Sequence, residues 1–168
     1  RERTTSCPMR ITALEGVTAV DVSCSRNATC VLTRCYPRPA RPATYRLWSF
    51  GDNSRGALGL NDSTLSIVSV PTQIASLTAH SPRALASGSF HSISLCAQGC
   101  AYAWGDNMFG QLGCAGSLGL VMDGPQLVGG GDNHALSPFR EWAIQATAGE
   151  DASYYLCTRG GTPLSRYV

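Results

Sequence analysis

Three side chains of types that bind zinc or carry out catalysis stand close together in the sequence: His91, Cys96 and Cys100. A zinc site built on such residues needs two ligand pairs at characteristic spacings, and no second pair follows these three. A cysteine nucleophile needs an adjacent base, and no thiol stands beside one in a strand-to-helix turn pattern. We therefore predict no catalytic residue, no metal site and no cofactor, and we expect His91 to be a hydrogen-bonded structural side chain.

Lysine chemistry is excluded as well, because all 13 basic residues of the chain are arginines. This removes Schiff bases, lysine general bases and the phosphate-binding lysine of Walker-type loops. Arginine keeps its charge and offers a planar fork of donors, which suits carboxylate recognition and partner surfaces.

The composition limits the class of protein further. The 168 residues carry a formal net charge of +2 and 14% of them are charged, so we do not expect nucleic-acid binding. No apolar run approaches the roughly 18 to 20 residues that cross a bilayer, and we expect no membrane span. Eight cysteines could indicate a disulfide framework, but several lie in apolar stretches, which favours reduced, buried thiols; these are Cys24, Cys30, Cys96 and Cys157.

Internal repeats dominate the sequence. Residues 50–59 match residues 104–113 at an offset of 54 (105 − 51 = 54). The motif places glycine, aspartate and asparagine at equal spacings: Gly51, Asp52, Asn53, Gly56 and Gly59 in the first copy, Gly105, Asp106, Asn107, Gly110 and Gly113 in the second. A phosphate-binding glycine loop would need a helix after it, and no helical pattern follows. We expect a structural role, in which glycine permits backbone angles and close approaches that a Cβ blocks and asparagine occupies turns.

A second block of about ten residues occurs three times. Its clearest copy covers residues 86–95 and contains Gly88 and His91. The other copies are residues 147–156, which contain Gly149 at an offset of 61 (149 − 88 = 61), and residues 23–32 at an offset of 63 (88 − 25 = 63). Three copies indicate a partial repeat domain over residues 1–168, with units at about 12–74, 83–128 and 140–168.

Within a unit the apolar residues alternate or form short runs between glycine-rich turns, as at Ile93 and Leu95. This is the periodicity of strands, and Gln98-Gly99 predicts a hairpin turn between two of them. Residues 137–146 offer the nearest candidate for a helix. The chain is therefore predicted to be all-β, and units of about 50 residues with glycine and aromatic motifs are typical of β-propeller blades.

Residues 104–113, with Gly88, His91 and Ser92 upstream, closely resemble the repeats of the regulator of chromosome condensation family. The resemblance covers roughly residues 12–158. It implies a seven-bladed propeller of four-stranded blades, of which this chain would supply about three. An open propeller exposes unpaired strands and apolar faces, so we expect further blades of the same chain, or partner subunits, to complete it.

The units differ most where the first one carries an inserted loop. From Leu32 to Phe50 is 18 positions (50 − 32), whereas from Leu95 to Trp104 is 9 (104 − 95), so the loop over residues 35–46 adds nine residues. Its prolines and interleaved arginines predict a stiff, extended, cationic segment. It is either a solvated loop without function or an arm that contacts a partner through Tyr36, Arg38, Arg41 and Arg46. A second insertion, over residues 129–138, is glycine-rich and predicts a flexible loop.

Two functions from different classes follow. A non-enzymatic protein–protein interaction scaffold, with other subunits of a larger assembly as partners, agrees with the lack of a catalytic constellation. The alternative, implied by the resemblance, is guanine-nucleotide exchange on a small GTPase, although the wedge and face loops that exchange requires find no residue-by-residue match. Light sensing, as in a plant ultraviolet receptor of similar sequence, is disfavoured, since the tryptophan that follows the block's glycine there is replaced by Arg26, Ser89 and Glu150.

The same resemblance implies an intracellular protein. We expect it in the cytoplasm or in a cytoskeletal or ciliary assembly, with the nucleus as a further location.

Overall fold

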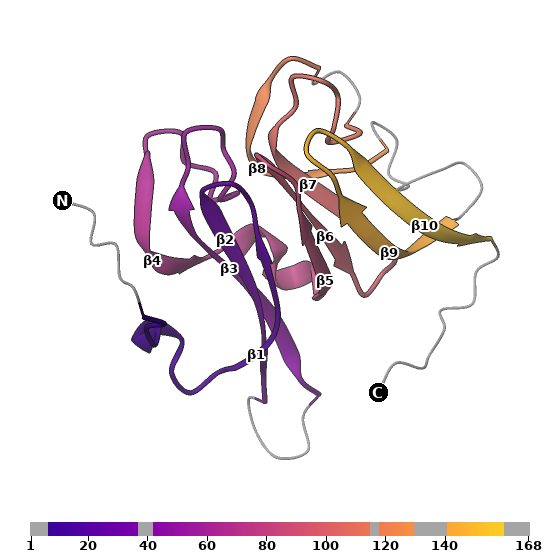
Figure 1. Ribbon diagram of the computed structural model, residues 1–168. Coiled ribbons are helices and arrows are strands. Elements are labelled where there is room, and N and C mark those ends of the chain that lie inside the picture. The colour runs from indigo at the N-terminus through magenta and orange to yellow at the C-terminus, as the bar shows by residue number, and fades with distance from the viewer. Residues whose placement is uncertain (1–6, 37–41, 115–117, 130–140, 160–168) are drawn as a thin grey trace.

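The computed structural model describes residues 7–36, 42–114, 118–129 and 141–159. These residues form antiparallel sheets with two short 3-10 helices, η1 (Thr12–Leu14) and η2 (Ala75–His80). The prediction of an all-β fold is confirmed. Figure 1 shows the sheets side by side in chain order, from indigo to yellow.

Each of the first two sheets is a four-stranded meander whose strands pair in sequence order. Blade 1 consists of β1 (Thr18–Cys24), β2 (Ala28–Cys35), β3 (Thr44–Asp52) and β4 (Ile67–Gln73); blade 2 consists of β5 (Pro82–Ser87), β6 (His91–Cys96), β7 (Ala101–Asp106) and β8 (Val121–Leu127). The strands of blade 3 within the described residues are β9 (Glu141–Ala148) and β10 (Ser153–Arg159). Gly99 has a φ of 78° in the turn between β6 and β7, where Gln98-Gly99 predicts a hairpin.

The helix considered for residues 137–146 is wrong in its described part, because residues 141–146 belong to β9. This segment pairs with β10, and β9 packs against β5 and β6 of blade 2. Tertiary pairing therefore decides its conformation over the helical propensity of its alanines and glutamate.

Apolar side chains fill the two junctions between neighbouring blades. At the first junction Leu32, Leu47 and Leu77 pack with Trp104 of blade 2, whose side chain is completely buried. At the second, Ile93 and Leu95 of blade 2 belong to a buried cluster that includes Ala143 of β9. Fully burying a leucine or isoleucine contributes about 1.5–3 kcal/mol, so both clusters stabilise the packing of neighbouring blades.

Equivalent apolar positions are exposed at both ends of the described part. Tyr154 and Leu156 lie 61 positions after Ile93 and Leu95 (154 − 93 = 61), and they are 61% and 56% exposed. Val22 lies 63 positions before Leu85 of the first junction (85 − 22 = 63), and it is 61% exposed. Blades 1 and 3 thus each carry an exposed apolar face, on the side of each blade that is turned away from blade 2.

The cysteines follow the expectation of buried thiols in part. Cys30 and Cys96 are buried free thiols, and burial raises the pKa of each to about 12. Cys24 is exposed, which corrects the sequence-based expectation, since β1 ends at the open side of blade 1. The side chain of Cys157 lies outside the described part.

No helix among the described residues is long and apolar enough to cross a membrane.

Candidate partner-binding surface

The two glycine motifs have the same backbone conformation. Gly51 and Gly105 have φ values of 117° and 106°, which L side chains rarely adopt. A Cβ at these positions would collide with the carbonyl oxygens of Asn27 and Phe90, respectively. Positive φ angles recur at the remaining glycines of both motifs: Gly56, Gly59, Gly110 and Gly113.

Side-chain oxygens of the motifs bind backbone N–H groups of their own loops. Asn53 Oδ1 accepts from the N–H of Leu58 at 3.1 Å, and Asn107 Oδ1 accepts from that of Leu112 at 2.9 Å. Asp52 and Asp106 each accept from the N–H two residues ahead, at 2.7 and 2.9 Å. Because these N–H groups bind the loop itself, they are not available to an external phosphate.

His91 lies between blade 2 and blade 3. Its Nε2 is 3.1 Å from Ser153 Oγ, and Ser153 Oγ donates to the carbonyl oxygen of Gln111 at 2.6 Å. The single hydroxyl proton of Ser153 is used in that bond, so Nε2–H of His91 is the donor to Ser153. Gly88 leaves room for the imidazole, since a Cβ there would collide with the ring.

The pKa of His91 lies below its ordinary value of 6.5 because the ring is buried. The backbone of Ala152 and the charges of Asp151 and Asp106 oppose this effect without cancelling it. Within the described part of the chain, His91 has no cysteine or second histidine bound to it, and no group of three metal-ligating side chains occurs there.

Backbone hydrogen bonds join the three blades at one position of the second block, the residue after Ser25, Gly88 or Gly149. The N–H of Arg26 donates to the carbonyl oxygen of Ser89 at 3.0 Å, and the N–H of Ser89 donates to that of Glu150 at 3.1 Å. These residues and Gly149 line an open hollow beside the ends of β1, β5 and β9. Gly149 itself begins a tight turn, donating to Ala152 at 2.8 Å.

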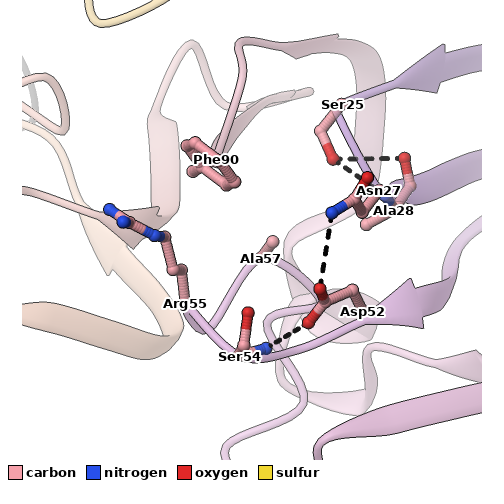
Figure 2. A pocket seen from close by; sticks show the side chains of 8 residues that line it. All are labelled: Ser25, Asn27, Ala28, Asp52, Ser54, Arg55, Ala57 and Phe90. Carbon is pink, nitrogen blue, oxygen red and sulfur yellow. Dashed lines mark hydrogen bonds between the residues drawn. The ribbon is translucent and has the colours of Figure 1, made fainter.

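A small pocket lies where the glycine loop of blade 1 meets Phe90 of blade 2 (Figure 2). The Asp52 carboxylate in it accepts from the Ser54 backbone and lies 3.5 Å from Asn27 Nδ2, and these bonds, led by Ser54, lower its pKa. Arg55 lies over the Phe90 ring, 4.5 Å from its centroid, and forms an ion pair with Asp106 of blade 2. The residues lining the pocket include no histidine or cysteine.

The inserted loop begins and ends as an extension of the β2–β3 ladder. Cys35 pairs with Thr44, Arg34 with Tyr45 and Thr33 with Arg46, which carries the hairpin beyond the length of β6 and β7. Tyr36 and Arg46 are exposed, at the end of β2 and within β3. Arg38 and Arg41 lie outside the described residues. Because facing pairs alternate between the two faces of the sheet, Arg46 is directed away from the face that carries Arg34 and Tyr45.

Three residues at this hairpin were not singled out from the sequence: Arg34, Tyr45 and Arg83. Arg34 Cζ lies 5.4 Å from the centroid of the Tyr36 ring, and Arg83 Cζ of blade 2 lies 4.1 Å from that of Tyr45. Arg34 and Tyr45 could have been noticed from the strand-like extension of the repeat, but the contact with Arg83 depends on how the blades pack.

Comparisons with known proteins agree with the repeat architecture. The family model for the regulator of chromosome condensation (RCC1) repeat matches residues 46–95, and a second model of the same description matches residues 83–111. The chain is 35% identical over 106 residues to human E3 ubiquitin-protein ligase HERC2, covering 63% of the chain and 2% of that protein. It is 30% identical over 124 residues to mouse Protein RCC2, covering 72% of the chain and 22% of that protein. The chain thus spans a small part of each relative.

Solved structures show the same fold at low sequence identity. Yeast RCC1 (Prp20), in complex with Kap60, superposes with a TM-score of 0.70 at 16% identity, over 88% of this chain and 31% of that one. Human WBSCR16 superposes with a TM-score of 0.65 at 19% identity, over 83% of this chain and 30% of that one. With its matched repeats and four-stranded blades, the chain belongs to the regulator of chromosome condensation repeat family and forms part of a β-propeller.

Proposed function

We propose that this chain is a non-enzymatic protein-interaction module of a larger assembly, and that the extended β2–β3 hairpin is its main contact element. The observation that carries the proposal is the departure of this hairpin from an otherwise repeated blade. The strands β2 and β3 continue past the ends of β6 and β7 and bring exposed Tyr36 and Arg46 to their edge. In repeat proteins, insertions on a regular scaffold are the usual positions of binding sites.

The repeated residues themselves support a scaffold over an enzyme. The polar atoms of Asn53, Asp106 and His91 bind groups of their own loop or of the next blade. The yeast relative Prp20 is seen bound to Kap60, and its binding to Gsp1p and histones is described, so protein binding is a known use of this fold. Nucleotide exchange remains a prediction, and so does the cytoplasmic, cytoskeletal, ciliary or nuclear location.

The proposal is tested by shortening the hairpin in the intact protein. Residues 34–46 would be replaced by the Ala97-Gln98-Gly99-Cys100 turn of blade 2, which the aligned strands accept. Proximity labelling in cells should then lose a defined subset of the neighbouring proteins. The control removes residues 130–138 of the second sequence insertion, which takes out the same net number of residues (13 − 4 = 9). An unchanged set of neighbours in the shortened variant, with normal protein levels, would remove the hairpin from the proposal.

A further inference from the structure

Arginine and tyrosine side chains alternate across the junction between blade 1 and blade 2. Arg34 and Tyr45 face each other on β2 and β3, so their side chains leave the same face of blade 1. Arg34 contacts the Tyr36 ring on one side, and Arg83 of blade 2 lies over the Tyr45 ring on the other. The four side chains Tyr36, Arg34, Tyr45 and Arg83 form what we call the arginine–tyrosine row.

Arg83 reaches this row because it occupies a β-bulge. The pairing of β5 with β6 shifts between Pro82 and Ala84, which leaves Arg83 as the additional residue. The same shift occurs in β1 around Val20 and in β9 around Ile144, at the offsets of the repeat (83 − 20 = 63, 144 − 83 = 61). A bulge redirects the side chain of its extra residue. Only blade 2 of the three places an arginine there.

The blade 1 members of the row are departures from the repeat too. The repeat offsets relate Arg34 to Ala97 (97 − 34 = 63) and Tyr45 to Gly99 (99 − 45 = 54), and both of these lie in the short turn of blade 2. The blade framework therefore does not require these side chains. The extended hairpin of blade 1 and the arginine at the bulge of blade 2 depart from the repeat separately, and both lie at the same junction.

The guanidinium groups of the row have no carboxylate partner in the described structure. The ion pairs found among the described residues are Arg10–Glu15 and Arg55–Asp106, and neither involves Arg34 or Arg83. Arg34 Nε is enclosed and has no hydrogen-bond acceptor among the described residues, and Arg83 is exposed. A guanidinium stacked on an aromatic ring keeps its N–H donors at the edge of the stack, where they can bind an anion.

We propose that the arginine–tyrosine row binds an extended acidic segment of a partner protein, an inference that rests on the proposed function and specifies the chemistry of the partner. Planar guanidinium forks bind carboxylates in bidentate fashion, and stacking fixes their orientation before the partner arrives. Nucleic acid fits the row less well, because arginines already cover faces of Tyr36 and Tyr45 that would stack on bases. The net charge of +2 is also too small to attract a polyanion from a distance.

The test measures fluorescence anisotropy of a labelled peptide of alternating glutamate and serine with the intact protein. Arg83→Ala and Arg34→Ala should each weaken its binding by about tenfold. Arg83→Lys, which keeps the charge and loses the planar fork, should lose a large part of the same affinity. The matched peptide of alternating glutamine and serine should not bind.

The control variant is Arg10→Ala, which removes the same charge at an exposed site outside the hairpin. Little change in this variant supports the row, and an equal loss of affinity would mean that only net charge matters, which overturns it. No binding of the acidic peptide also overturns it. So does stronger binding of a single-stranded oligonucleotide or of anionic lipid vesicles that depends on Arg34 and Arg83. If shortening the hairpin removes cellular neighbours but the acidic peptide does not bind, the acidic partner is refuted and the proposed function still stands.

Discussion

The indole N–H of Trp104 in blade 2 donates a hydrogen bond of 3.0 Å to the carbonyl oxygen of Ala57 in the glycine loop of blade 1. At the next junction the equivalent carbonyl, that of Gln111 (111 − 57 = 54), accepts from Ser153 of blade 3 at 2.6 Å. Each glycine loop therefore offers the same backbone oxygen to the following blade, and the donor is a side chain that differs between junctions.

Trp104→Phe should destabilise the protein more than its volume change suggests. Phenylalanine stands at the equivalent position 50, so the ring is compatible with the blade, but the buried Ala57 carbonyl would lose its donor. A buried unsatisfied group costs about 1–3 kcal/mol. Urea unfolding of the intact protein measures the loss. Trp48→Phe is the control, because it also removes an indole donor, here to Thr33 Oγ1 at 2.9 Å. It should cost less, since Thr33 Oγ1 keeps its bond to the Arg46 carbonyl and Trp48 is only half-buried; equal losses would argue against the junction bond.

Gly51→Ala and Gly105→Ala should each cost more than the roughly 1 kcal/mol that a positive φ alone imposes on alanine. Both substitutions place a methyl group against a carbonyl oxygen of the neighbouring turn, at Asn27 or Phe90. Gly16→Ala separates the two effects, because Gly16 has a φ of 80° and a Cβ added to it would meet no atom within 4 Å. Thermal unfolding should rank the two motif variants well below Gly16→Ala, and three equal midpoints would contradict the steric argument.

His91 should make the protein less stable as the pH falls below about 6.5. Above that pH the ring is neutral in both folded and unfolded chains. Below it the unfolded chain binds a proton that buried His91 resists, because its folded pKa is lowered, so the free energy of unfolding decreases. His91→Gln should flatten the dependence of stability on pH, measured in urea titrations at about pH 7.5 and 5.5. His80→Gln, at a half-exposed site, is the comparison variant. A wild-type slope that persists in His91→Gln would assign the acid sensitivity elsewhere.

Replacing Arg38 and Arg41 by alanine should leave folding intact and weaken assembly. Surface substitutions usually change stability by less than about 0.5 kcal/mol, whereas arginines at a binding hot spot contribute at least about 1 kcal/mol. Co-purification with the partners found by proximity labelling measures assembly, and a melting curve measures stability. Unchanged partner affinity in the double variant would identify the loop as solvated and without function.

Residues 1–168 expressed alone should self-associate through the exposed face of blade 3. Tyr154 and Leu156 occupy positions that are buried in blade 2, as Ile93 and Leu95 show. The double change of Tyr154 and Leu156 to serine should lower the apparent mass in light scattering, and Val70→Ser, at an exposed site of the outer strand β4, should not. A stable monomer with a cooperative transition would contradict this expectation.

The strands could be predicted from the sequence because the repeat shows each apolar pattern more than once. The pairing of glycine motifs at one offset identifies β3 and β7 as equivalent, and the structure gives them the same place in their sheets. Residues 141–146 could not be assigned in this way, since their strand conformation depends on pairing with β10. Arg83 was missed for a related reason, because a bulge becomes visible only in the register of two paired strands.

The chain of backbone bonds from Arg26 to Ser89 to Glu150 runs in one direction, with each N–H donating to the blade that follows. Such a series has two unlike ends: a carbonyl at Arg26, which suits a donor from a preceding blade, and an N–H at Glu150, which suits an acceptor from a following one. Two copies related by a twofold axis would bring like groups together at this position. Any extension that continues the series must therefore join head to tail, and a head-to-tail series ends only when its last member meets its first.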